Sequence, residues 1–94
     1  MLEDEFEWDE AKAASNLEKH DVSFDDACAV FRDPFAIELF DDRENYGEDR
    51  YILIGMTAGR VLVVVHTLRE DRHRIISARK AESNEQRFYQ EANR

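Results

Sequence analysis

The segment from residue 60 to residue 80 carries the side chains best suited to phosphate chemistry. It holds six basic residues against two acidic ones, and it also contains His66 and His73. The planar guanidinium group of arginine binds a phosphate through two parallel hydrogen bonds and stays charged at any working pH. A histidine side chain exchanges a proton near neutral pH. These are the parts needed for metal-free RNA cleavage, in which a 2′-hydroxyl attacks the adjacent phosphate while arginines stabilise the developing charge.

Two predicted strands, 60–69 and 72–80, bring these side chains together. The turn at 70–71 places residues 67–69 opposite residues 72–74. Because side chains alternate between the faces of a strand, Thr67 and Arg69 share a face and His66 lies on the other. On the last strand, strict alternation predicts two sets of side chains on opposite faces. One face carries Arg72, Arg74, Ile76 and Ala78, and the other carries His73, Ile75, Ser77 and Arg79. The sequence therefore predicts a patch of Arg, His and hydroxyl groups at one end of a sheet, with Arg79 further along.

A simpler interpretation of the same residues is a charged, solvated strand edge, since charge commonly protects sheet edges. Other chemistry is less well supported. The spacing of the three histidines does not match a metal site, and the acidic stretch 41–49 lacks an EF-hand pattern and is more typical of a solvated loop. Cys28, the only cysteine, lies beside Ala27 on a predicted helix face, which favours packing over nucleophilic chemistry.

The charge of the chain is unevenly distributed. The formal net charge of −9 at first argues against nucleic acid, because binding to phosphate favours positive charge. Residues 1–50, however, hold 17 acidic and 5 basic side chains, a net of −12, whereas residues 51–94 hold 5 and 8, a net of +3. This asymmetry indicates a polyanion or an oppositely charged partner for the basic half.

Length and composition predict a single domain over residues 1–94 that is soluble and cytoplasmic. The longest apolar run, 61–65, is far too short to cross a membrane, and the acidic start of the chain is unlike a secretory signal. A single cysteine excludes an internal disulfide.

The hydrophobic periodicity predicts an α+β domain with the element order β-α-α-β-β-β-β-α. A short strand at 6–8 precedes a helix hairpin: the first helix is capped by Asp9 and runs to about residue 20, and the second is capped by Ser23 and ended by Pro34. This hairpin should pack on one face of a mostly antiparallel sheet of four to five strands, with further strands at 36–40 and 50–56.

Two more specific expectations concern the second half of the chain. The run 61–65 is apolar on both faces, which is typical of a central strand covered on both sides, so Val63 and Val64 should both be buried. Ser83, with Gln86 three residues later, predicts a capping box that opens a C-terminal helix.

Segments along nearly the whole chain resemble the BrnT family of toxins. The first half supplies Phe6-Glu7-Trp8-Asp9, Lys12, Asn16, Lys19-His20, Val22-Ser23-Phe24 and Asp33-Pro34; the second half supplies Glu48-Asp49-Arg50, Thr67, Arg69, the run from Arg74 to Ala81, and Glu85. Asp21 stands where the family usually has glycine, and a positive φ is expected there, which Asp tolerates better than most residues. The resemblance implies a RelE-like ribonuclease fold and a toxin of a type II toxin–antitoxin system. It also implies a BrnA-like ribbon-helix-helix antitoxin, through which alone the complex would contact operator DNA.

The resemblance also carries roles to matching residues. It implies that Arg69 and Arg79 stabilise the scissile phosphate and that His66 acts as an acid or base. The RNA-binding candidates are Arg72, Arg74, Lys80 and Thr67, and the secondary candidates are Glu48 and His20. The expected reaction needs neither metal nor cofactor. The alternative is a catalytically degenerate toxin that only binds its antitoxin and helps to repress DNA, and the net negative charge favours that alternative.

Overall fold

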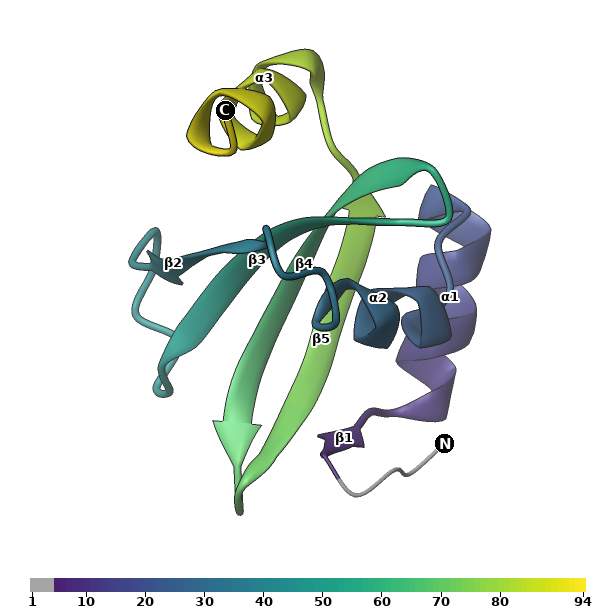
Figure 1. Cartoon of the computed structure of the whole chain (residues 1–94). Coiled ribbons are helices and arrows are strands. Elements are labelled where there is room, and N and C mark those ends of the chain that lie inside the picture. The colour runs from purple at the N-terminus through teal and green to yellow at the C-terminus, as the bar shows by residue number, and fades with distance from the viewer. Residues whose placement is uncertain (1–4) are drawn as a thin grey trace.

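The computed structural model describes residues 5–94. Its eight elements follow the predicted order: β1 (Phe6–Glu7), α1 (Glu10–His20), α2 (Phe24–Val30), β2 (Ile37–Asp41), β3 (Arg50–Thr57), β4 (Arg60–Arg69), β5 (Arg72–Lys80) and α3 (Ser83–Ala92). The strands form one five-stranded sheet in the order β1-β5-β4-β3-β2 (Figure 1). Only the β1–β5 pair is parallel. The predicted α+β fold with a mostly antiparallel sheet is confirmed.

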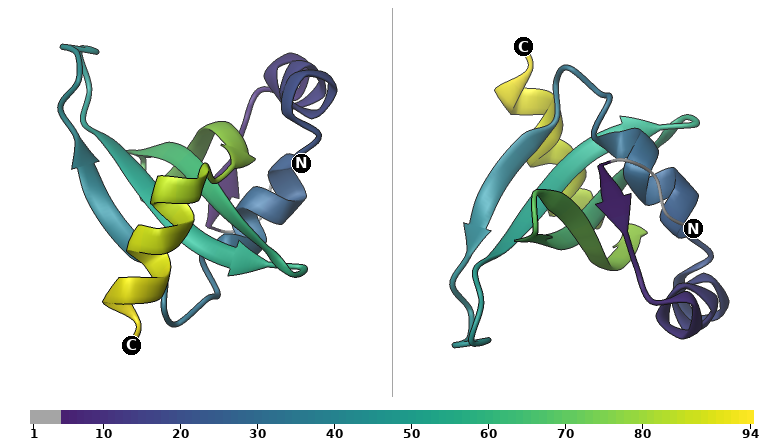
Figure 2. Two further views of the ribbon diagram at one scale, coloured as in Figure 1. Left: turned by 90° about the horizontal axis from the view of Figure 1, so that it is seen from above. Right: turned by 90° about the horizontal axis from the view of Figure 1, so that it is seen from below.

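Helices cover both faces of the sheet (Figure 2). The α1–α2 hairpin packs on one face, where Leu62 and Val64 of β4 join the larger core cluster. On the other face, Tyr89 of α3 packs against a smaller cluster that includes Val63. Val63 is 4% exposed and Val64 is fully buried, which confirms that β4 is a central strand covered on both sides. Among the described helices, none has the length and apolar character needed to cross a membrane.

Local sequence signals explain the helix hairpin. The side chain of Asp9 accepts hydrogen bonds from the backbone N–H groups of Ala11 and Lys12, and Ser23 caps α2 in the same manner. Asp21 ends α1 in the left-handed region at φ 56°, as expected from its place in the sequence. This single left-handed residue lets α2 begin only a few residues after α1 ends.

The predicted start of α3 is wrong by one residue. Glu82, not Ser83, is the N-cap, and the capping box pairs Glu82 with Glu85 rather than Ser83 with Gln86. A glutamate is less usual than serine at this position, so the sequence pattern favoured the wrong pair. The Gln86 side chain instead donates to the carbonyl oxygen of Ala81.

The predicted alternation of side chains between the two faces of β5 is also wrong, because it does not continue past Ile76. Val65 of β4 pairs with Ser77, but the next residue, His66, pairs with Ile75, so Ile76 has no partner in the register. Such a β-bulge shifts the alternation by one residue. As a result, Arg72 and Arg74 lie on the same face as Arg79, although strict alternation separates them.

One buried side chain fixes α1 to the edge of β5. The Asn16 amide nitrogen donates to the carbonyl oxygens of Ala78 (2.7 Å) and Val22 (3.0 Å), and its oxygen accepts from the N–H of Ala78 (3.1 Å). Asn16 therefore occupies the two backbone groups of Ala78 that a neighbouring strand would otherwise pair with.

We expect Asn16→Asp to destabilise the fold by about 2–4 kcal/mol, because a carboxylate cannot donate and would face two buried carbonyl oxygens. Urea denaturation measures this loss. Ser15→Ala, at the exposed neighbouring position, is the matched control and should change the free energy of unfolding little. Wild-type stability in Asn16→Asp would show that α1 is held by packing alone.

Candidate functional site

The arginines predicted to contact RNA lie on the sheet face that α3 partly covers. The register pairs Arg69 with Arg72 and Thr67 with Arg74, so all four share this face with Arg79. Three of the arginines are bound to carboxylates: Arg74 to Glu7 at 2.6 Å, Arg69 to Glu48 at 3.6 Å, and Arg79 to Glu85 at 2.8 Å. The Thr67 hydroxyl is buried and donates to the carbonyl oxygen of Asp49, so it acts within the fold.

Arg69 and Arg79 lie at opposite ends of this face. Arg79 pairs with Val63, and Arg69 lies six residues further along β4. At about 3.3 Å per residue, this separates the two backbone positions by roughly 20 Å. The two guanidinium groups, each held by its own carboxylate, do not form one phosphate site in this structure.

His66 lies on the opposite face of the sheet and is 1% exposed. Its Nε2 lies 3.0 Å from a carboxylate oxygen of Glu38, and its ring packs against Phe31, Tyr51 and His73. Its Nδ1 is buried and has no hydrogen-bond partner among the described residues. Burial lowers the pKa of His66, and the nearby Glu38 offsets only part of this effect. The structure therefore places His66 in an aromatic cluster, apart from the arginines.

The lowered pKa of His66 predicts a loss of stability in acid. Because the unfolded chain takes up this proton at a higher pH than the folded chain, the free energy of unfolding should fall as the pH drops below about 6.5. His66→Phe should reduce that slope, since Phe suits the aromatic cluster and does not titrate. His20→Phe, at an exposed position, is the control. Urea denaturation between pH 7.5 and about 5 measures the slope, and equal slopes in wild type and His66→Phe would assign the acid sensitivity to other groups.

A groove between α1 and the edge of β5 collects basic side chains from both ends of the sequence. Its wider part, of about 490 Å³, is lined by Lys19, His20, Arg79, Lys80 and Glu82. Its narrower part, of about 210 Å³, is lined by Lys12, Ser15, Asn16, Lys19, His20, Ile76 and Ser77. Lys19 and His20 line both parts, so the two hollows lie next to each other along α1. We call this surface the basic groove.

The basic groove contains all three lysines of a chain that has 22 acidic residues. Lys80 has a weak contact with Asp21 at 3.8 Å, and Glu82 also lines the wider part. Within residues 5–94, neither Lys12 nor Lys19 takes part in an ion pair. The unpaired positive charge in this hollow makes it the candidate anion site of the described structure.

Sequence reasoning missed Lys12 and Lys19 as site residues, and it gave His20 only a secondary role. A usable signal was present, because residues 12, 16 and 19 follow the spacing of one helix face. The missing information was that this face lies against β5, which depends on the buried hydrogen bonds of Asn16 to Ala78.

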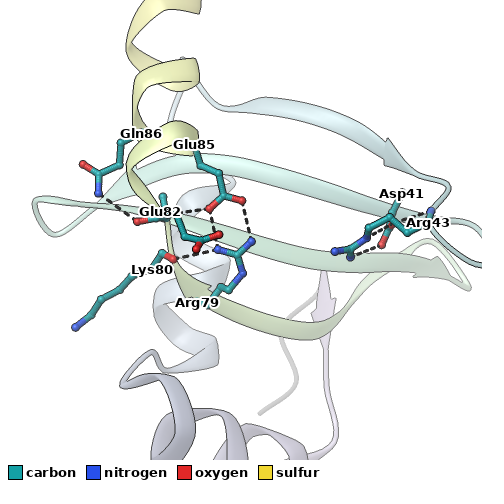
Figure 3. A network of polar contacts seen from close by, with 8 residues as sticks. Asp41, Arg43, Arg79, Lys80, Glu82, Glu85 and Gln86 are labelled. Atoms are coloured by element: carbon teal, nitrogen blue, oxygen red, sulfur yellow. Dashed lines mark hydrogen bonds and ion pairs between the residues drawn. The ribbon is translucent and has the colours of Figure 1, made fainter.

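Arg79 is held in place by the first turn of α3 (Figure 3). Its two terminal nitrogens donate to the two carboxylate oxygens of Glu85, both at 2.8 Å. The same Glu85 carboxylate accepts the backbone N–H of Glu82 at 2.8 Å and so completes the helix cap. Glu85 raises the pKa of Arg79, and Arg79 lowers the pKa of Glu85. Neither of the bonds to Glu85 uses the Nε–H of Arg79, which can therefore donate to another acceptor beside the groove.

This arrangement can bind a phosphate and transfer a proton beside it. Arg79 and Lys80 provide donors on one wall, and Lys19 and His20 provide an ammonium group and an exposed imidazole on the other. Among residues 5–94, no three His, Cys, Asp or Glu side chains lie close enough to hold a metal ion. The side chains that line the groove supply acid–base and electrostatic chemistry.

Comparison with known proteins is consistent with this chemistry. A family model described as the ribonuclease toxin BrnT of type II toxin–antitoxin systems matches residues 8–85. The match includes both walls of the basic groove, from Lys12 on α1 to Lys80 on β5. No curated protein matches the chain significantly.

Proposed function

The chain belongs to the BrnT family of ribonuclease toxins of type II toxin–antitoxin systems, and from this premise we propose that it cleaves RNA in the basic groove without a metal ion. The observation that carries the proposal is the convergence of Lys19, His20, Arg79 and Lys80 on one hollow. An RNA-cleaving protein needs a cationic phosphate site with a proton-transfer group beside it, and this groove offers both.

In the proposed reaction, the 2′-oxygen of one nucleotide attacks the adjacent phosphorus. A bond forms between the 2′-oxygen and phosphorus while the bond from phosphorus to the 5′-oxygen breaks, which leaves a 2′,3′-cyclic phosphate and a 5′-hydroxyl. His20 takes the proton of the 2′-hydroxyl, water donates a proton to the departing 5′-oxygen, and the hydroxide that remains takes the proton from His20 and restores its neutral imidazole. Arg79 and Lys80 stabilise the negative charge that develops on the phosphoryl oxygens.

We assign proton transfer to His20 rather than to His66 because of their positions. His20 is exposed at the end of α1 and lines the groove beside Arg79. His66 is 1% exposed on the other face of the sheet. On the α3-covered face lie Arg69, Arg72 and Arg74, where they would contact RNA beyond the groove. Glu48 would bind Arg69 when Arg69 is not in contact with RNA.

A type II toxin has a cognate antitoxin, and we propose that this one is a ribbon-helix-helix protein. Inhibition is simplest if the antitoxin places carboxylates in the basic groove in competition with RNA phosphate. Glu85 already binds Arg79 in this way within the chain. The complex would reach operator DNA only through the antitoxin, since the toxin carries a net charge of −9.

A second function, antitoxin binding without catalysis, is favoured by one observation. Both terminal nitrogens of Arg79 are already bound to Glu85, which weakens the electrostatic attraction of Arg79 for a phosphate. Purified protein incubated with RNA separates the two functions, because only the first produces cyclic-phosphate ends.

We expect Arg79→Ala to lower the rate of RNA cleavage by on the order of a hundredfold, since a charge-assisted contact to the transition state is commonly worth about 3 kcal/mol. Arg79→Lys should restore only part of the rate, because a point charge lacks the guanidinium fork. Arg87→Ala, exposed on α3, is the control for loss of one positive charge. Cleavage of a labelled oligonucleotide in excess chelator measures these rates; full activity of Arg79→Ala, or loss of wild-type activity on chelation, would contradict the mechanism.

His20→Ala tests the proton-transfer role separately. We expect it to slow cleavage and to flatten the dependence of the rate on pH near neutrality, where an imidazole changes its charge. The rate–pH profile of purified protein is the measurement, with His66→Phe as the comparison. If only His66→Phe flattens the profile, proton transfer belongs to the buried histidine instead.

A further inference from the structure

The narrower part of the basic groove has a composition of its own. Lys12, Ser15 and Ser77 line this part and not the wider one, and no acidic side chain is among its lining residues. The wider part, by contrast, includes Glu82. The narrower part therefore has lysine and serine side chains and no carboxylate among its lining residues, in a protein of net charge −9.

The polar groups of this hollow are suited to an anion. Lys12 and Ser15 are exposed on α1, and Ser77 faces them from β5. An ammonium group and two hydroxyls can all donate hydrogen bonds to phosphate oxygens. The amide of Asn16 does not compete for that anion, because it is bound to the backbone of Val22 and Ala78.

The length of the groove exceeds what one phosphate needs. Lys12 and Lys19 are seven residues apart on α1, which corresponds to roughly 10 Å along the helix axis. The groove continues from Lys19 and His20 to Arg79 and Lys80. A concave, cationic path of this length follows the backbone of a single nucleic-acid strand better than it fits an isolated anion.

We propose that Lys12, Ser15 and Ser77 form a second phosphate subsite, which binds a backbone phosphate of the same RNA strand that is cleaved beside Arg79. The inference rests on the proposed function, since it takes the wider part of the groove as the cleavage site. It assigns the protein a substrate class, a single strand longer than a dinucleotide, whose neighbouring phosphate anchors it along α1.

The length of the substrate provides the test. A dinucleotide has one phosphate and can occupy only the cleavage site, whereas an octanucleotide also reaches the second subsite. Lys12→Ala should raise KM for the octanucleotide by a larger factor than KM for the dinucleotide, because only the octanucleotide reaches the second subsite. Arg87→Ala is the matched control, because it removes one positive charge from the exposed side of α3 and should affect neither substrate.

Binding provides the second readout. An octanucleotide with 2′-deoxy sugars lacks the attacking hydroxyl, so its affinity can be measured without cleavage. Each phosphate contact contributes about 0.7 to the slope of log affinity against log salt for single strands. Lys12→Ala should lower that slope by about this amount, and Arg87→Ala should not.

Three outcomes are distinguishable. Dependence of the Lys12→Ala effect on substrate length supports the subsite. Equal behaviour of Lys12→Ala and Arg87→Ala on the octanucleotide overturns it, even if Arg79→Ala abolishes cleavage and the proposed function stands. Loss of dinucleotide cleavage in Lys12→Ala also overturns it and places Lys12 at the reacting phosphate.

Discussion

The side-chain amide of Asn16 holds together the two parts of the chain on which the groove depends. Within residues 5–94, β1 pairs with β5 only at His73 and Arg74, and no other strand pairs with the edge of β5 beyond them. Asn16 meets both backbone groups of Ala78 at that edge, and α1 takes the place of a strand. Because α1 is rigid over its length, one buried contact positions every side chain on that helix face.

The acidity of the protein has a structural explanation that does not conflict with RNA binding. Many carboxylates are used inside the fold: Asp9 caps α1, Asp41 binds Arg43 through two bonds, and Glu85 serves both Arg79 and the cap of α3 (Figure 3). The bound Arg43 lowers the pKa of Asp41 to about 2. Net charge therefore says little about the local charge of the groove, where two lysines have no carboxylate partner among the described residues.

Local signals made most of the fold predictable. Capping side chains at Asp9 and Ser23, the apolar run 61–65 and the turn at 70–71 each act within a few residues, and the structure has the elements that they indicate. The sequence analysis gave Arg79 as a phosphate-stabilising candidate, Lys80 as an RNA-binding candidate and His20 as a secondary candidate, and all three line the wider part of the groove. Their roles remain predictions.

The rest depended on contacts that no local pattern encodes. The groove forms because residue 16 meets residue 78, a separation of 62 positions in the chain. The bulge at Ile76 is equally invisible in the hydrophobic pattern, because Ile75 and Ile76 are both apolar and either could face the core. Alternation along β4 did place His66 on the face opposite Arg69, but the sequence could not show that aromatic rings bury His66 there.

The β-bulge divides β5 into two segments, on either side of Ile76, in which side chains alternate regularly between the faces of the sheet. Residues 72–75 and 77–80 each alternate regularly, but they are offset from each other by the extra position. Arg74 and Arg79 are five positions apart, which would place them on opposite faces of a regular strand, so the bulge itself returns them to one face. A homologue one residue shorter, with a regular strand in place of the bulge, would still keep the two arginines on one face, whereas a homologue of the same length without the bulge would turn them to opposite faces.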